Sequence, residues 1–325
     1  MKHRLLLLLF TLGLGLPISG CLHFQTKPSG FKPEQDGAFL SLSVKSKGQP
    51  QRSWKIHYRE RGNVGNPTVV MIHGYGSSST VWLPLMIALE RMGYRTLAID
   101  LPGFGLTDKY PGDYNTLTIA RRVAQFMDAK GIKTADVLAH SWGSSVALSL
   151  RVLYPRKVRR IVIHSGWVYS AQIVPVIRWS KLPLVGEIIY GMFYKERPGD
   201  KFAQSVYDSK RLVTQPIVEK IKESFNRPGA VAAALAVARG MDFTRVEKKY
   251  HTIANPTLLI WGKQDHVALP YYGRRLVTHL KQAQLVFIDR CGHIPMIEQP
   301  YLVNRYVTSF LGPAKNLRNV EVRRR

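Results

Sequence analysis

A serine flanked by small residues is the feature of this chain that most directly indicates chemistry. Ser141 lies between Ala139 and Gly143, after the apolar run 135–138 and before the helical pattern 144–153. This order predicts a strand, a sharp turn with the serine at its apex, and a helix; small residues two before and two after the serine let strand and helix pass closely. The turn would expose the hydroxyl and leave backbone N–H groups free at the start of the helix.

Two downstream side chains could activate this hydroxyl. A serine hydroxyl is a weak nucleophile at neutral pH and needs an adjacent base. His293 could take the proton of Ser141 and later deliver it to the leaving group, while Asp265 could hold the imidazole tautomer and stabilise the imidazolium. The acid and the base each follow an apolar strand-like run. Because open α/β sheets place ligands at the carboxyl ends of their strands, we expect the three side chains to meet there.

Three other histidines lie close to these residues. His140 adjoins Ser141, but as a strand-end neighbour its side chain is expected to point away from the hydroxyl. His266 follows Asp265 and would face the other way in extended backbone, which leaves it a structural or substrate-lining role. His73 follows an apolar run and is expected to brace the loop that it opens.

The order of these motifs resembles that of the α/β-hydrolase family. The resemblance spans residues 54–311 and rests on five segments in the family's order: His73-Gly74-Tyr75-Gly76, residues 100–105, the elbow around Ser141, the Trp-Gly-x-x-Asp at 261–265 and the Gly-His-Ile-Pro segment at 292–300. The chain departs from the family's pattern at the first elbow position, where Ala139 stands in place of glycine.

The resemblance implies a role for each site residue. Ser141, Asp265 and His293 would form the catalytic triad. The backbone N–H groups of Tyr75 and Trp142 would form the oxyanion hole. Relatives that open epoxides or displace halides carry aspartate at the elbow, so a serine there favours acyl chemistry. We expect no cofactor and no metal.

Asp289 and Cys291 lie just before the predicted base. Asp289 is the alternative orienting acid, and Asp265 is preferred because it matches the family position. We expect Cys291 to be a small buried side chain rather than a reactive thiol. If Cys21, the other cysteine, is modified as described below, Cys291 has no partner and no disulfide forms.

Strand-like and helical runs alternate along most of the chain, which predicts an α/β fold with a mostly parallel sheet and helices on both faces. The strand-like runs are 54–58, 68–72, 95–99, 135–138, 160–164, 257–261 and 284–288, and the helical runs are 80–92, 117–130, 144–153 and 271–280. We assign residues 38–166 and 254–312 to an α/β-hydrolase core.

The alternation breaks over residues 167–253, where prolines separate several short helical runs: 185–194, 201–209, 217–225 and 230–239. The family commonly inserts a helical cap at this point, so we assign this segment to a cap. Its first part, residues 167–193, is markedly apolar and aromatic. It would pack on the core, form an apolar substrate pocket or face a membrane, and these roles are compatible.

Residues 1–20 are typical of an export signal. Basic residues precede the apolar run 5–16, which is too short to span a bilayer comfortably. The small residues just before Cys21 resemble a bacterial lipobox, which implies lipidation of that cysteine; an ordinary secretory signal or an uncleaved anchor is the alternative. We expect residues 21–37 to form a flexible tether. The expected location is the bacterial cell envelope, as a membrane-anchored lipoprotein facing the periplasm or the cell exterior.

The chain is strongly basic, with 47 Lys and Arg against 21 Asp and Glu and a formal net charge of +26. Such a surface attracts anionic partners. Nucleic acid is disfavoured, because the basic residues are spread along the chain and no nucleic-acid-binding motif is present. Anionic lipid headgroups fit an anchored protein better, although a generally basic proteome would also account for the charge. Residues 313–325 are expected to be a solvated basic tail.

Together these observations predict a serine hydrolase that cleaves carboxylic esters through an acyl-enzyme, with lipid-like or other apolar acyl substrates. Amidase, thioesterase, acyltransferase and carbon–carbon bond hydrolase chemistry would use the same triad. A non-catalytic binding module is the alternative from another class, and the complete triad disfavours it.

Overall fold

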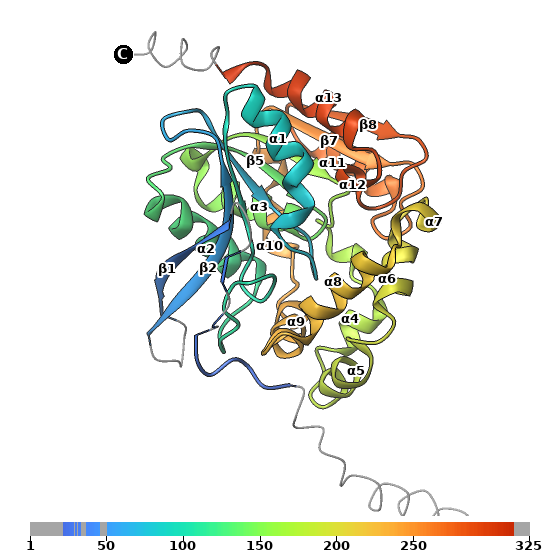
Figure 1. Ribbon diagram of the computed structural model, residues 1–325. Coiled ribbons are helices and arrows are strands. Elements are labelled where there is room, and N and C mark those ends of the chain that lie inside the picture. Colours follow the sequence, from blue (N-terminus) through green and yellow to red (C-terminus); the bar gives the residue numbers. More distant parts are fainter. Residues whose placement is uncertain (1–21, 29, 31, 34–36, 46–50, 315–325) are drawn as a thin grey trace, which may run out of the picture.

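The computed structural model describes residues 22–28, 30, 32–33, 37–45 and 51–314, and an eight-stranded sheet forms its centre (Figure 1). The strand order is β1-β2-β4-β3-β5-β6-β7-β8. The pairs β1–β2 and β2–β4 are antiparallel and all the others are parallel, which confirms the predicted mostly parallel sheet. The strands are β1 (Gly37–Val44), β2 (Arg52–Arg61), β3 (Thr68–Ile72), β4 (Arg95–Ile99), β5 (Ala135–His140), β6 (Val158–His164), β7 (Thr257–Gly262) and β8 (Ala283–Ile288).

Helices cover both faces of the sheet, because alternate residues of each central strand point to opposite sides. In β3, Val70 and Ile72 pack with the helices α2 (Thr116–Ala129), α3 (Gly143–Leu153) and α11 (Pro270–His279). Val69 and Met71 pack with α1 (Leu83–Arg91) and α13 (Pro300–Leu311) on the other face. The short helix α12 (Pro295–Glu298) precedes α13, and single-turn 3₁₀ helices are η2 (Ser79–Trp82), η3 (Pro155–Lys157), η4 (Ser170–Gln172) and η5 (Tyr250–Thr252).

Seven helices lie between β6 and β7; α4 to α9 gather beside the core in Figure 1, whereas α10 lies next to α3 of the core. They are α4 (Pro175–Trp179), α5 (Val185–Phe193), α6 (Pro198–Ser205), α7 (Ser209–Leu212), α8 (Gln215–Asn226), α9 (Ala230–Arg239) and α10 (Thr244–Glu247). The alanine-rich α9 is the buried centre of this group, with Ala233, Ala234 and Val237 fully enclosed. We refer to this helical region as the cap.

The predicted tether 21–37 is attached to the folded domain over part of its length. The Gln25 N–H donates to the Lys109 carbonyl (3.0 Å), and the Gln25 side chain donates to Asp108 Oδ1 (2.9 Å). The Phe24 ring stacks on Tyr114, with ring centroids 6.0 Å apart. Because Gln25 pairs with backbone groups of a buried loop, this segment differs from the flexible tether expected from its composition.

Several predictions concern residues outside the described part of the chain: the signal at 1–20, Cys21, and all of the basic tail except its first two residues. Among the described residues, no helix is both long enough and apolar enough to cross a membrane.

Candidate active site

The predicted turn at Ser141 connects β5 to α3. Ser141 is buried and has a left-handed backbone with φ of 51°, a conformation that costs a non-glycine residue roughly 1–2 kcal/mol. Backbone hydrogen bonds hold it there: its N–H donates to the His164 carbonyl (3.0 Å), and its carbonyl accepts from the N–H of Trp167 (2.9 Å). The neighbouring strand β6 and the start of the cap therefore fix the position of the hydroxyl.

Small residues around the serine are required by close backbone contacts. A Cβ atom on Gly143 would lie 2.3 Å from the His73 carbonyl oxygen, so strand β3 leaves no room for a side chain at this position. A Cβ atom on Gly74 would lie 2.9 Å from the Ser141 Cβ. Ala139, where the family has glycine, is fully buried between β3 and β6, and the sheet accommodates its methyl group.

The three side chains predicted to act together form one hydrogen-bonded relay. His293 Nε2 lies 2.9 Å from Ser141 Oγ, and His293 Nδ1 lies 2.9 Å from Asp265 Oδ2. All three residues are buried. The other carboxylate oxygen of Asp265 accepts the N–H groups of Val267 (2.9 Å) and Ala268 (2.8 Å), so the acid is fixed on both sides.

The alternative orienting acid does not reach the imidazole. Asp289 is exposed and its carboxylate accepts the Gln264 amide (3.1 Å), a hydrogen bond that lowers the pKa of Asp289. Asp265 is therefore the carboxylate that contacts His293, as expected. Cys291, two residues before the histidine, is fully buried, and burial raises the pKa of its thiol.

Two of the three neighbouring histidines, His140 and His73, have structural contacts. His140 Nε2 lies 2.8 Å from the His293 carbonyl oxygen, and burial lowers the pKa of His140 well below its ordinary value. His73 Nε2 accepts the N–H of Leu101 (2.9 Å), which braces the loop after β3 as predicted. His266 is exposed.

The two predicted oxyanion donors lie on the loops expected. Trp142 follows the serine, and Tyr75 belongs to the loop after β3. In the part of the chain that the structure describes, neither backbone N–H donates a backbone hydrogen bond. The Tyr75 hydroxyl lies 2.9 Å from the Tyr190 hydroxyl and 3.1 Å from the Ala234 carbonyl oxygen, so two cap helices hold this loop.

Glu298 is a positioning residue that sequence reasoning missed. Its buried carboxylate accepts the N–H groups of Gly292 (2.8 Å) and Ile294 (2.9 Å), on either side of His293. The same carboxylate accepts the N–H of Tyr207 in the cap (2.7 Å). The acidic residue within the Gly-His-Ile-Pro segment at 292–300 was the available signal, but the groups that its carboxylate contacts could not be inferred from the sequence.

Asp100 and His57 form a second buried pair that was also missed. His57 Nδ1 lies 2.8 Å from Asp100 Oδ2, and the carboxylate also accepts the N–H groups of Ser79 (2.6 Å) and Leu106 (2.8 Å). Although burial alone would raise the pKa of Asp100, its hydrogen bond and charge interaction with His57 lower it. The pair stabilises the loop after β4, whose structural role was expected.

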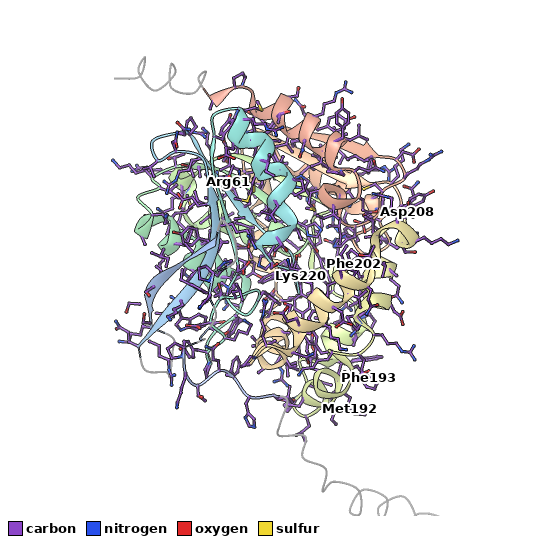
Figure 2. The ribbon with its side chains drawn as sticks, viewed as in Figure 1. Arg61, Met192, Phe193, Phe202, Asp208 and Lys220 are labelled. Atoms are coloured by element: carbon purple, nitrogen blue, oxygen red, sulfur yellow. The ribbon has the colours of Figure 1, made fainter. Side chains whose placement is uncertain are left out.

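The relay opens into a cavity of about 770 Å³ between core and cap. Ser141 and His293 lie on its wall, and most of the cap's contribution is apolar: Val174, Val176, Ile177, Ile189, Phe193, Phe202, Ile217, Ile221 and Phe225. Its basic lining residues are Arg59, Lys201, Lys220 and Arg227. Figure 2 shows Phe202 and Lys220 on the cap helices near the core. Among the described residues, no group of three or more His, Cys, Asp or Glu could hold a metal ion.

Comparison with known proteins agrees with this architecture. The model of the alpha/beta hydrolase fold family matches residues 67–300. A 2-hydroxy-6-oxononadienedioate/2-hydroxy-6-oxononatrienedioate hydrolase of Cupriavidus pinatubonensis is 27% identical over 270 residues, covering 80% of this chain and 91% of the relative. Lipase 1 of Psychrobacter immobilis is 26% identical over 257 residues, covering 75% and 76% respectively.

Among solved structures, that of a membrane phospholipase A, described as a bacterial virulence factor, is 26% identical with a TM-score of 0.65, covering 86% of this chain and 87% of that one. The family model covers most of the chain and includes the serine, acid and base of the relay. The chain is therefore an enzyme of the alpha/beta hydrolase fold family.

Proposed function

We propose that this hydrolase cleaves carboxylic esters of apolar acyl groups through an acyl-enzyme on Ser141. The carrying observation is the relay of Ser141, His293 and Asp265 on the wall of a largely apolar cavity. Ser141 Oγ attacks the ester carbonyl while His293 Nε2 accepts its proton. Asp265 holds the imidazole through Nδ1 and stabilises its positive charge.

The remaining steps use the same groups. The N–H groups of Tyr75 and Trp142 donate to the oxyanion of the tetrahedral intermediate. His293 then gives its proton to the leaving alcohol, and the acyl group remains on Ser141. A water molecule, deprotonated by His293, attacks the acyl-enzyme and releases the carboxylic acid.

The apolar cavity favours acyl chains over small polar acyl groups, because apolar surface that leaves water contributes about 25 cal/mol per Å². The cap lines the cavity with aliphatic and aromatic side chains, including Ile177, Phe202 and Phe225. The similarity to a lipase and to a membrane phospholipase A supports the same substrate class.

Substitution of the nucleophile tests the proposal. In Ser141→Ala, ester turnover should fall by roughly five to six orders of magnitude, and a fluorophosphonate probe that labels activated serines should no longer react. The matched control is Ser149→Ala on α3, whose buried hydroxyl has no hydrogen-bond partner among the described residues. Rates on p-nitrophenyl esters of increasing chain length would define the acyl preference. Near-normal turnover in Ser141→Ala would refute the mechanism.

Carbon–carbon bond hydrolysis is the second candidate. The relative from Cupriavidus pinatubonensis is named for dioate substrates, and this chain covers 91% of its length. A dianionic substrate needs cationic groups, and Arg59 and Lys220 line the same cavity as Ser141 and His293. The disappearance of such a dienedioate in the presence of the enzyme can be followed directly. Cleavage of the dienedioate without turnover of any p-nitrophenyl ester would favour this candidate over the first.

We also propose that the enzyme is a lipoprotein of the bacterial cell envelope, anchored through Cys21. The support is the lipobox-like sequence before this cysteine. Intact-mass analysis of the exported protein should show a chain that begins at Cys21 and carries acyl chains, and Cys21→Ser should be unprocessed or released. A mature chain without lipid that begins at another residue would contradict this proposal.

A further inference from the structure

Large apolar side chains gather on the outer surface of the cap. They come from α4, α5 and the segment between them, and we call them the apolar cap face: Val176, Trp179, Leu184, Ile188, Met192 and Phe193. Trp179 is 59% exposed, Leu184 75% and Met192 60%. Figure 2 shows Met192 and Phe193 at the outer end of the cap, away from the sheet. Contiguous exposed apolar surface of this kind marks an interaction site.

The apolar cap face is not the core-packing side of these helices. The buried positions of α4 and α5 are Ile177, Gly186 and Tyr190. The Ile177 and Tyr190 side chains pack in the core, and Gly186 lies against α9. The helix α5 is therefore apolar on its exposed side as well as on its packed side. Packing against the core does not require apolar residues at positions 184, 188 and 192. The apolar character of these exposed side chains therefore needs a separate explanation.

Part of the apolar cap face also lies at the rim of the active-site cavity. Val174, Val176 and Phe193 line the cavity and are at the same time substantially exposed. The cavity therefore opens to solvent among these side chains. An apolar molecule that reached this surface would meet these apolar side chains at the cavity that contains Ser141.

The start of the described chain lies beside this surface. Leu22 Cδ1 is 3.9 Å from the position that a Cβ atom would take on Gly191 in α5. The hydrogen bonds of Gln25 to residues 108 and 109 fix this approach. The described chain therefore begins next to the apolar cap face, and Cys21 and the apolar run 5–16 precede this point in the sequence.

Basic side chains come from the same segment. Arg178, Lys181, Lys195 and Arg197 flank the apolar positions in the sequence, with Lys181 donating to the Met241 carbonyl (2.7 Å), and the acidic Glu187 is paired with Arg239 (2.7 Å). Apolar side chains bordered by basic ones suit the interface of an anionic bilayer, because apolar groups enter the headgroup region and basic groups are attracted to its negative charge.

We propose that the apolar cap face docks on an anionic lipid bilayer, with α4 and α5 seated in the headgroup region and the cavity mouth open to the membrane. The position of residue 22 beside α5, the basic border and the shared rim all favour a bilayer over a second copy of the chain. Docking of this kind goes beyond the proposed ester hydrolysis. Fluorescence quenching of Trp179 measures docking without any measurement of ester turnover.

Trp179 provides a direct test in the full chain. The other five tryptophans are buried, each less than 9% exposed, so Trp179 is the tryptophan placed to meet lipid. The protein is reconstituted on phosphatidylcholine–phosphatidylglycerol vesicles whose acyl chains carry bromine, a collisional quencher. Wild-type fluorescence should be quenched and Trp179→Phe should lose this quenching. Equal quenching of the two proteins, no quenching, or protection of Trp179 by self-association would overturn the proposal.

A second test separates docking from catalysis. Leu184 and Met192 belong to the apolar cap face but do not line the cavity. The double variant Leu184→Asp and Met192→Asp should lose at least about tenfold in rate on an ester embedded in vesicles. Its rate on a short water-soluble ester should match wild type. Val64→Asp, at an 81% exposed position outside the cap, is the matched control. An equal loss of rate on both substrates, or no loss on vesicles, would contradict docking. Wild-type enzyme that hydrolysed no ester would instead refute the proposed function.

Discussion

The carboxylate of Asp265 uses its two oxygens for different tasks. Oδ2 contacts the imidazole of His293, and Oδ1 accepts two backbone N–H groups that fix the carboxylate plane. An amide in this position would present its NH₂ either to the ring nitrogen or to the two N–H donors. Either orientation removes a favourable contact, and the first favours the wrong histidine tautomer.

We therefore expect Asp265→Asn to lower turnover by roughly 10⁴-fold with the fold intact. Asp289→Asn is the control, because Asp289 is exposed and hydrogen-bonded to Gln264 rather than to the base. Steady-state kinetics on one ester, with circular dichroism to confirm folding, would measure both effects. A mild effect of Asp265→Asn beside a crippling effect of Asp289→Asn would reverse the assignment of the acid.

Among single residues, those whose types and order along the chain are distinctive could be predicted from the sequence. The placement of Ser141, Asp265 and His293 in one relay followed from chemistry and from family resemblance. Glu298 and His57 were missed because nothing in the sequence shows which backbone N–H groups or which carboxylate their side chains contact. Only the packing of the cap and the loop after β4 determines these partners.

The elbow is the element with the least free space. Gly143 begins α3 directly against the carbonyl groups of Ile72 and His73 in and after β3. Any side chain at this position must push the helix away from the strand, which also displaces the serine. The same crossing explains why the helix starts immediately after the turn.

We expect Gly143→Ala to destabilise the enzyme by about 1–3 kcal/mol or more, since an added Cβ overpacks the site. Gly191→Ala is the matched control in α5. A Cβ atom there meets nothing closer than 3.9 Å, and alanine is favoured in a helix interior by up to about 1 kcal/mol. Urea unfolding of both variants measures the change in the free energy of unfolding. Equal stabilities would show that the contact between α3 and β3 can adjust to a Cβ atom.

The loop between β4 and α2 contains a buried cation. Lys109 Nζ donates to the carbonyl groups of Gly105 (2.9 Å) and Thr107 (2.8 Å), and burial lowers the pKa of this lysine to about 7. Between pH 7 and the ordinary lysine pKa the unfolded chain binds more protons than the folded chain. The free energy of unfolding therefore rises with pH in this window because of Lys109.

Replacing Lys109 by methionine should remove this contribution. The difference in free energy of unfolding between wild type and Lys109→Met should change by up to about 1.4 kcal/mol per pH unit above pH 7, in favour of wild type. Lys133→Met, at an exposed position, is the control. Urea unfolding at pH 7, 8 and 9 measures the effect, and parallel profiles would show that Lys109 is charged throughout.

The elements were predicted best where one kind of periodicity dominated. The bounds of β3, β4 and α9 match the expected runs. Strand β1 and helix α13 were not predicted. In β1 the alternation of apolar and small polar residues is confined to residues 40–44, and the strand pairs antiparallel with β2. In the cap, α4, α7 and α10 are single turns whose helical form depends on their neighbours.

The whole molecule carries a net charge of +26. If the bilayer is its partner, hydrolysis of the same ester should be faster on anionic than on neutral vesicles at low salt. The excess should fade as salt rises, because the screening length shortens to about 8 Å at physiological ionic strength. Rates on both vesicle types across a salt series test this expectation. Equal rates at low salt would contradict a role of the net charge in attracting the enzyme to anionic lipid.

The Glu298 carboxylate joins two regions that the chain order separates. It accepts N–H groups on both sides of His293 and one from Tyr207 in the cap, and the His293 N–H itself donates to the Ser205 carbonyl (2.7 Å). Opening of the cap at this point removes partners from the base loop, so the two should open as one cooperative unit. Amide hydrogen exchange should show this directly: the amides of Tyr207, Gly292 and His293 should share one protection factor, and Glu298→Gln should lower it for all three.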